Sequence, residues 1–223
     1  MENTIDPQLS SEKINALTGK EMPLRDANWE QEFLEHLPNI KFKLLNEQPQ
    51  VGPDGWPYMM VEISEDGTEP CVNLIHWLGE RGIGLAINPN KEYPDYVLTY
   101  GMVWNYLQRG QFVTPVTQEE LNTEFDLKEG QELWIGQPTE EYFPGYARKV
   151  FKNFLANQNV LAPKMLMVSA DQKNYDLALS LESLGNPPQK EWQGILEAFS
   201  WFMPAHYRLS LMSETSVEGF SAI

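Results

Sequence analysis

The sequence reads LWIG (133–136), PGYARKVFKNFLA (144–156), MLMV (165–168), YDLALSL (175–181), PQKEWQGILEAFSWF (188–202) and YRLSLM (207–212), and these six segments decide the fold. In the second and fifth segments apolar residues recur every three or four positions, which is typical of one face of a helix. The other four are short apolar or alternating runs, which are typical of strands. The order strand, helix, strand, strand, helix, strand is that of the split βαβ, or ferredoxin-like, unit. We therefore expect an α+β protein in which residues 132–214 form a ferredoxin-like sheet with both helices on one face.

A second α+β half is expected at residues 40–113. Its predicted elements are the two strands of a hairpin at 40–44 and 58–63, a helix at 71–81, a buried strand at 83–87 and a mostly helical stretch at 96–107. The sequence GPDG (52–55) supplies the turn of the hairpin. Gly82 follows the first helix at the place where a left-handed cap favours glycine.

Three further parts flank or join the halves. They are an N-terminal helical arm at 1–39, a connector at 114–131 and a tail at 215–223. In the arm, Asn28 lies three residues before Gln31, as in a capping box, and Pro38 stops the helix that follows. The connector is polar and charged, which is typical of a link between two folded halves.

The chain is acidic. Its 16 Lys and Arg residues stand against 32 Asp and Glu residues, which gives a formal net charge of −16 that is spread over both halves. Phosphate backbones and anionic lipid surfaces are bound through clustered Lys and Arg, so this charge disfavours nucleic acid and membrane partners. A protein partner is expected instead, and a basic one would suit the charge.

Cysteine usage indicates the compartment. Cys71 is the only cysteine, so no intramolecular disulfide can form, and its neighbours Val72 and Leu74 suit a buried, reduced thiol. The N-terminal residues have neither the basic nor the apolar region of a signal peptide, and no run of about 18 apolar residues occurs. We expect a cytoplasmic protein, and the sequence does not indicate its oligomeric state.

Two phrases resemble a known family. They are GIGLAINP (82–89) and LWIGQP (133–138), the latter followed by Tyr142 and Pro144. The first resembles a strand exit in the N-terminal half of bacterial SseB-like (serine-sensitivity enhancer) proteins, and the second resembles the opening of their C-terminal half. The resemblance covers about a fifth of the chain. It implies a two-part α+β accessory or interaction protein without established catalytic residues, and it carries no functional residue over to this sequence.

One group of residues has the chemistry of a metal site. His76 and Glu80 lie four apart on the predicted helix 71–81, with Cys71 upstream. Cys71 is five residues from His76 and points elsewhere, so the plainer interpretation is a buried thiol beside a solvated pair. As a nucleophile Cys71 would need a lowered pKa, and the preceding Glu69 and Pro70 oppose that. We expect no metal site and no catalytic residue here.

A glycine-rich stretch invites a nucleotide-binding interpretation. GERGIG (79–84) lies between the predicted helix and the predicted strand 83–87. Phosphate-binding loops run from a strand into a helix and present the helix N-terminus to the anion, so the order here is wrong. We expect no cofactor.

The first half is rich in amphipathic aromatic residues. We consider six of them as a candidate recognition surface: Trp56, Tyr58, Trp77, Tyr93, Tyr96 and Trp104. Such residues line peptide grooves and protein interfaces, where they supply a large contact area at low entropic cost. Each of them could equally fill the core, since aromatic residues are mostly buried.

Three functions are compatible with these patterns. The first is a non-enzymatic protein-interaction or accessory protein that binds its partner through the aromatic-rich half. The second is a small hydrolase or transferase that uses carboxylates and a histidine, either His76 or His206, in a groove between the halves. The third is an acidic secretion chaperone or toxin-neutralising protein with a basic partner.

Overall fold

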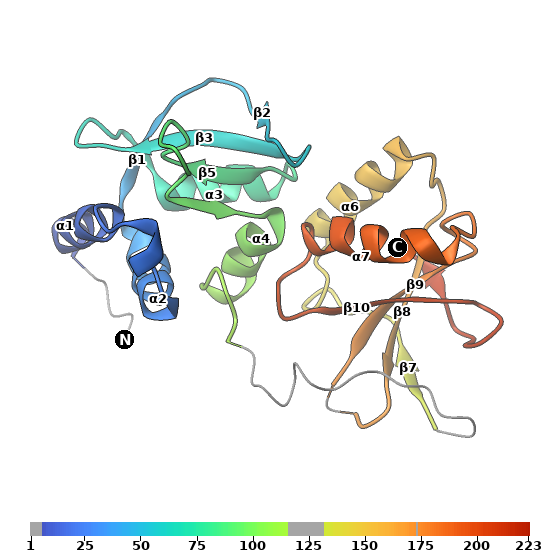
Figure 1. Cartoon of the computed structure of the whole chain (residues 1–223). Helices are drawn as coiled ribbons and strands as arrows, with labels where there is room; N and C mark the ends of the chain where they lie inside the picture. The colour runs from blue at the N-terminus through green and yellow to red at the C-terminus, as the bar shows by residue number, and fades with distance from the viewer. Residues whose placement is uncertain (1–5, 116–131, 173) are drawn as a thin grey trace. The chain divides into compact units, whose positions relative to one another are not determined.

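The chain folds into two compact units, residues 1–112 and 113–223, each of which combines helices with a mixed sheet. The structure is a computed structural model, and it describes residues 6–115, 132–172 and 174–223 (Figure 1). The predicted α+β class is confirmed. The predicted connector falls almost entirely outside the described residues.

The helices and strands of the first unit lie between Pro7 and Arg109. Its elements are α1 (Pro7–Thr18), η1 (Met22–Leu24), α2 (Ala27–His36), η2 (Leu37–Asn39), β1 (Lys41–Leu44), β2 (Gln50–Val51), β3 (Pro57–Ile63), β4 (Glu69–Pro70), α3 (Cys71–Gly79), β5 (Gly84–Ile87), β6 (Tyr96–Leu98) and α4 (Tyr100–Arg109). The strand order is β4-β1-β3-β5-β6, with β2 beside β3. Among the described strand pairs of the first unit, only β3 and β5 run parallel, and α3 is the crossover between them.

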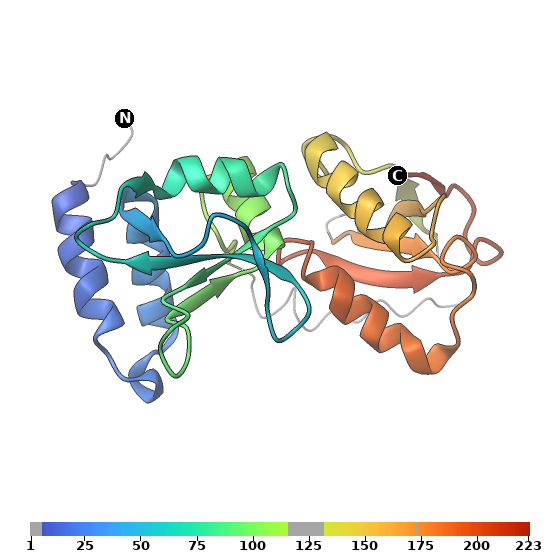
Figure 2. The ribbon, with the colours of Figure 1, turned by 90° about the horizontal axis from the view of Figure 1, so that it is seen from above.

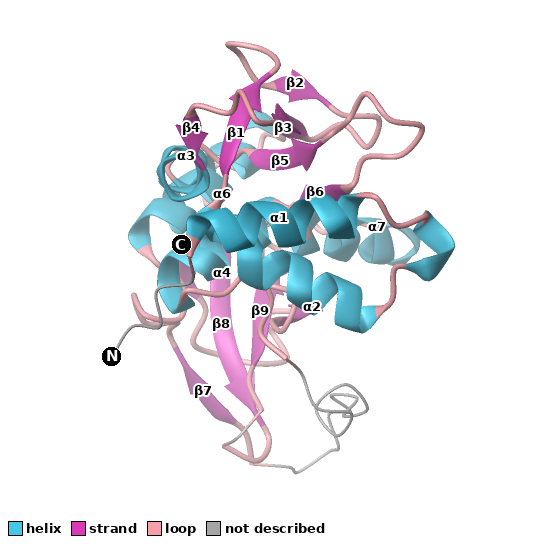
Figure 3. Ribbon diagram, turned by 90° about the vertical axis from the view of Figure 1, so that its left-hand side faces the viewer, coloured by secondary structure: helices cyan, strands magenta, loops and turns pink. Residues whose placement is uncertain are grey.

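The helices of the first unit enclose one core with the sheet. In Figure 1 α1, α2 and α4 lie below β1 and β3, and α1 and α2 run side by side (Figures 2 and 3). Alternate strand residues such as Phe42, Val61 and Leu85 are buried together with Ile75 of α3 and Phe33 of α2. The N-terminal arm therefore belongs to the core of this unit, because its apolar face covers the sheet.

The stretch predicted as mostly helical divides in two. Tyr96–Leu98 forms β6, and α4 begins after Thr99, whose side-chain oxygen accepts a hydrogen bond from the Met102 N–H. α4 ends at Gly110, which has a left-handed φ of 72°. The sequence of residues 96–107 is compatible with both a strand and a helix, and the N-cap at Thr99 marks where the strand ends and the helix begins.

A buried ion pair fastens the arm to the loop after β5. The Asp95 carboxylate accepts hydrogen bonds from Arg25 (2.7 Å), Lys91 (2.6 Å) and Asn88 (2.5 Å). The Asn88 side chain also accepts from the Ile63 N–H at the end of β3. Burial by itself raises the pKa of Asp95, but the three donors outweigh it and hold the pKa below its ordinary value.

The second unit has its own sheet and helix pair. Its elements are β7 (Trp134–Gly136), α6 (Gly145–Asn157), β8 (Lys164–Ser169), β9 (Asp176–Ser180), α7 (Gln189–Ser200), β10 (Arg208–Met212) and β11 (Ser221–Ala222). The order is β10-β9-β8-β11, with β7 also beside β8. Both helices lie on one side of the strands, where Phe151 of α6 and Phe199 of α7 meet with ring centroids 5.1 Å apart (Figure 1). In the described ranges no helix is both long and apolar enough to cross a bilayer.

The element order of the second unit is as predicted, but its strand pairing is not ferredoxin-like. In a split βαβ unit a third strand separates the two strands that each helix joins. Here β9 and β10 are direct parallel neighbours, and β7 pairs antiparallel with β8. The three-residue β7 is too short to separate two longer strands, so it stays at the edge of the sheet.

The predicted tail also belongs to this unit. β11 pairs with β8, and Val217 is buried against Leu166 and Val168. These two β8 residues lie on the sheet face opposite to Met165, because successive side chains alternate. The C-terminal segment therefore covers the second face of the sheet.

The two units repeat one arrangement. In each, a helix precedes an antiparallel strand pair, and a crossover helix leads to a third strand parallel to the second. The members are α2, β1, β3, α3 and β5 in the first unit and α6, β8, β9, α7 and β10 in the second. Corresponding positions in the two sheets can therefore be compared by register.

We expect Arg25→Ala to lower the free energy of unfolding by about 3 to 5 kcal/mol, because it leaves the buried Asp95 charge without its buried partner. Lys91→Ala is the control, since the Lys91 side chain is 47% exposed, and it should cost less than about 1 kcal/mol. Urea unfolding at pH 7 measures both.

The pH dependence gives a second readout of the same pair. A carboxylate with a lowered folded-state pKa contributes stability above the ordinary Asp value of about 3.9 and loses it as the pH falls through the folded-state pKa. The difference between the wild type and Arg25→Ala should therefore narrow below about pH 4. Equal losses in Arg25→Ala and Lys91→Ala would contradict the role given to the buried pair.

Candidate functional site

The six aromatic residues expected to form a recognition surface do not lie together on the surface. Tyr58 and Trp104 are buried, because Tyr58 packs under the 52–55 turn through a bond from its hydroxyl to Asp54 and Trp104 lies on the buried side of α4. Tyr96 is half-buried, stacks on Phe33 and donates to Glu30. The remaining three differ in exposure: Trp56 is half-buried, Trp77 is 37% exposed and Tyr93 is 60% exposed. The expectation of one surface is corrected accordingly.

The proposed metal-type cluster is also dispersed. His76 is exposed on α3 and Glu80 is exposed directly after it, and the Arg81 guanidinium lies 4.5 Å from the centroid of the Trp77 ring. Cys71 is fully buried at the start of the same helix, and burial raises the pKa of its thiol, which disfavours a reactive thiolate. Within the part of the chain that the structure describes, no three His, Cys, Asp or Glu side chains gather as a metal site requires.

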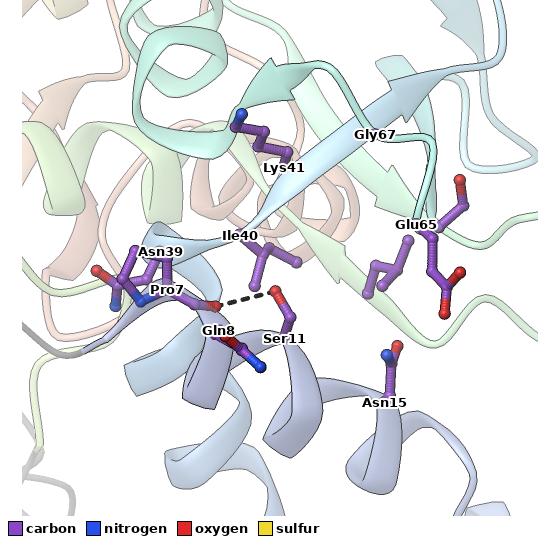
Figure 4. Close-up of a pocket in the computed structure, with 11 residues that line it drawn as sticks. Pro7, Gln8, Ser11, Asn15, Asn39, Ile40, Lys41, Glu65 and Gly67 are labelled. Atoms are coloured by element: carbon purple, nitrogen blue, oxygen red, sulfur yellow. Dashed lines mark hydrogen bonds between the residues drawn. The ribbon is translucent and has the colours of Figure 1, made fainter.

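A hollow of about 270 Å³ with several polar side chains in its lining lies in the first unit at the carboxyl end of β3 (Figure 4). Gln8, Ser11 and Asn15, at successive turns of α1, form one wall. The other wall is formed by Lys41, the residues 63–65 and Gly67. The hydroxyl of Ser11 is bonded back to the Pro7 carbonyl, so the amide side chains supply most of the free polarity of the α1 wall.

An apolar groove of about 540 Å³ lies in the second unit between α6 and α7. Phe154, Leu155 and Val160 line one side, and Ile195 and Ala198 line the other. Gly194 is part of the lining, and a Cβ placed there would meet no atom within 4 Å. The predicted helical stripe of α7 is therefore only partly covered: Phe199 is buried, while Trp192, Ile195 and Leu196 are half-buried.

A hydrogen-bonded carboxylate network lies at the carboxyl end of β9. Glu214 accepts from Lys164 Nζ (2.7 Å) and from the Ser180 hydroxyl (2.6 Å). Glu182 accepts from the Ser213 hydroxyl (2.5 Å) and from the Glu214 N–H (2.9 Å). The bond from Lys164 lowers the pKa of Glu214, and the bond from Ser213 lowers the pKa of Glu182. Both groups are held in the charged form.

A buried ion pair crosses the parallel strands of the same sheet. Asp176 Oδ1 lies 2.7 Å from Arg208 Nε, and the Asp176 side chain is only 5% exposed. Burial raises the pKa of Asp176, and Arg208 offsets only part of that shift. Among the described residues, Arg208 Nη1 and Ser210 Oγ are buried without a hydrogen-bond partner. The pair is therefore incompletely satisfied, and its burial costs stability.

The sequence did not single out the groove, the network or the buried pair. The one local signal for the groove is Gly194, because a glycine inside a predicted helix costs about 1 kcal/mol relative to alanine and calls for a structural reason. The network and the pair depend on which strands are neighbours, and the predicted pairing was wrong in this respect.

We expect Asp176→Ala to lower the free energy of unfolding by about 3 to 5 kcal/mol, since it leaves the Arg208 charge unpaired. The double variant Asp176→Leu/Arg208→Met should be neutral or up to about 4 kcal/mol more stable, because packed apolar residues replace an incompletely bonded pair. In the first unit the strand positions that correspond to Asp176 and Arg208 are occupied by Met60 and Ala86, which also face each other across parallel strands. Apolar residues are therefore compatible with this arrangement of strands.

Urea unfolding between pH 3 and pH 7 tests both variants. A carboxyl group with a raised folded-state pKa is best tolerated when it is protonated, so any advantage of the double variant should shrink as the pH falls to 3. A double variant that is as unstable as Asp176→Ala would show that the pair is required by the fold.

Neither a known family model nor a curated protein nor a solved structure matches the chain.

Proposed function

We propose that the chain is a non-enzymatic interaction protein, and that the groove between α6 and α7 binds an amphipathic helix of a basic partner. The observation that carries the proposal is the uncovered apolar lining of the groove, with open space at Gly194. This surface lies in the second unit, whereas the sequence favoured the aromatic residues of the first.

The shape of the groove suits a helix. Two neighbouring helices present a linear apolar depression, and an amphipathic helix fills such a depression with residues at positions i, i+3, i+4 and i+7. Gly194 and Ala198 lie one turn apart on α7, so a partner can approach this helix closely. Leu184 and Ile195 would contact the apolar side chains of the partner.

Charge complementarity indicates the polar face of the partner. The chain carries a net charge of −16, while the groove itself has one Lys and one Glu, Lys190 and Glu191, in its lining. The net charge of the whole chain would attract a helix that has an apolar face for the groove and Lys or Arg on its other face, although α6 itself carries Arg148, Lys149 and Lys152. Nucleic acid and anionic membranes are disfavoured by the same charge.

Two of the other functional hypotheses agree with this proposal, and one differs from it. A cytoplasmic SseB-like accessory protein and an acidic chaperone or toxin-neutralising protein are both forms of the proposed function, since each would bind a protein partner. The hydrolase or transferase hypothesis requires a histidine beside a carboxylate in a pocket. The linings of the hollow and of the groove contain neither histidine nor cysteine.

A defined peptide tests the proposal. The probe is a fluorescein-labelled 15-residue helix with Leu at i, i+3, i+4 and i+7 and Lys elsewhere, compared with a scrambled peptide of the same composition. We expect the amphipathic peptide to bind at least about tenfold more tightly than the scrambled one in fluorescence anisotropy at physiological salt, because only the former presents an apolar face.

Two matched variants locate the binding. Gly194→Leu fills the open groove and should weaken binding of the amphipathic peptide by about tenfold or more, with the fold intact because the added atoms enter empty space. Gln193→Leu adds the same side chain on the exposed face of α7 and should leave binding unchanged. Equal binding of the two peptides, or an equal effect of the two variants, would refute the proposal.

A further inference from the structure

β10 is the outermost strand at one edge of the second sheet. It pairs with β9, in parallel from Arg208 to Met212, and no other described strand pairs with it. Its counterpart in the first unit is β5, which pairs parallel with β3 on one side and antiparallel with β6 on the other. The described part of the second unit therefore lacks the strand that β6 supplies in the first.

Burial differs between the two strands in the way that a missing neighbour predicts. All four residues of β5 are buried, whereas four of the five residues of β10 are only half-buried. Leu209 follows Arg208 as Ile87 follows Ala86, and Ile87 is fully buried and paired with Tyr96 of β6. A further strand beside β10 would remove the half-exposed apolar area of Leu209 from water.

The backbone groups on the outer side of β10 are those of Leu209 and Leu211. Successive residues of a strand direct their N–H and C=O groups alternately to its two sides. The Met212 carbonyl accepts from the Leu181 N–H, so Met212 and Ser210 direct their backbone groups toward β9. Leu209 and Leu211 direct theirs outward, where no described residue bonds to them. Such a row of unpaired groups is a template for an added strand.

Two side chains of β10 also lack a hydrogen-bond partner among the described residues. Arg208 Nη1 and Ser210 Oγ are buried and unbonded, although the Arg208 side chain as a whole is 23% exposed. They lie on the sheet face opposite to Leu209 and Leu211, because side chains alternate along a strand. Asp176 already compensates the Arg208 charge, so a neutral hydrogen-bonding group suits this position better than a second carboxylate.

We propose that the outer edge of β10 binds an extended segment of a partner protein, which pairs antiparallel with residues 208–212 as β6 pairs with β5. The segment has apolar side chains opposite Leu209 and Leu211 and a glutamine opposite Ser210. The glutamine C=O accepts from Arg208 Nη1 on the diagonal, and its NH₂ donates to Ser210 Oγ. This edge is separate from the groove between α6 and α7, so the inference does not depend on the proposed function.

A second copy of the chain suits the edge less well than a different protein. Antiparallel pairing of β10 with itself about Ser210 would place each Arg208 opposite a Met212, whose side chain has no oxygen for Nη1. Two chains that each carry a net charge of −16 also repel each other.

The test uses the full chain and the capped peptide acetyl-Lys-Thr-Val-Gln-Val-Thr-Lys-amide. NMR follows hydrogen exchange of the Leu209 and Leu211 amides, which become bonded to the two valines of the peptide in an antiparallel pair. We expect exchange at both amides to slow as the peptide saturates the chain. A peptide that is N-methylated at both valines cannot form these bonds and should produce no slowing.

The glutamine is tested by one peptide change and two matched serine variants. Replacing it with leucine should weaken binding by about tenfold, because Arg208 Nη1 and Ser210 Oγ stay unbonded. Ser210→Ala should weaken binding of the glutamine peptide by about fivefold and leave the leucine peptide unaffected. Ser200→Ala removes an exposed hydroxyl at the end of α7 and should change neither.

The inference is overturned if exchange at Leu209 and Leu211 does not slow, if the N-methylated peptide binds equally well, or if leucine replaces glutamine without loss. Light scattering of the free chain tests the other occupant. A dimer in which both amides are already protected without peptide would also overturn the inference, since a second copy would then cover the edge. The peptide comparisons use the wild-type chain, so they decide the question even if a variant fails to fold.

Discussion

Two neighbouring parallel strands can be joined only by a crossover that passes over one face of their sheet, and both units are organised around this constraint. α3 makes the crossover from β3 to β5, and α7 makes it from β9 to β10. Each crossover helix buries an apolar face on the strands, and the helix that precedes the sheet packs on the same side. The opposite face is therefore left to loops, to polar side chains and, in the second unit, to the C-terminal segment around Val217.

Most elements could be predicted from the sequence because their periodicity is local. Tyr175–Leu181 alternates and contains β9, and the stretch Cys71–Arg81 has helical spacing and contains α3. The partner of each strand could not be predicted in the same way, because pairing depends on residues far apart in the chain. The order of elements in the second unit fits both a split βαβ sheet and the observed adjacent pair, and the shortness of β7 decides between them only once the strands are placed.

The candidate site was harder to predict for a related reason. Tyr58 and Trp77 are both amphipathic aromatic residues in apolar surroundings, yet Tyr58 is buried by a turn that carries Asp54 and Trp77 is left at the surface of α3. Composition gives the same expectation for both. The apolar lining of the α6–α7 groove is equally invisible in the periodicity, because a helix with a half-covered stripe has the same spacing as one that is fully covered.

The repeat separates what the fold needs from what one unit adds to it. Where the second unit has the ion pair of Asp176 and Arg208, the first has Met60 and Ala86, so the strand framework does not require charge at that position. Lys41 and Lys164 show the converse: each is the first residue of its strand, and Lys164 is paired with Glu214, whereas Lys41 is exposed and forms no ion pair with a described residue. Desolvating a charge costs free energy unless a partner compensates it, and Lys41 avoids that cost by remaining in water.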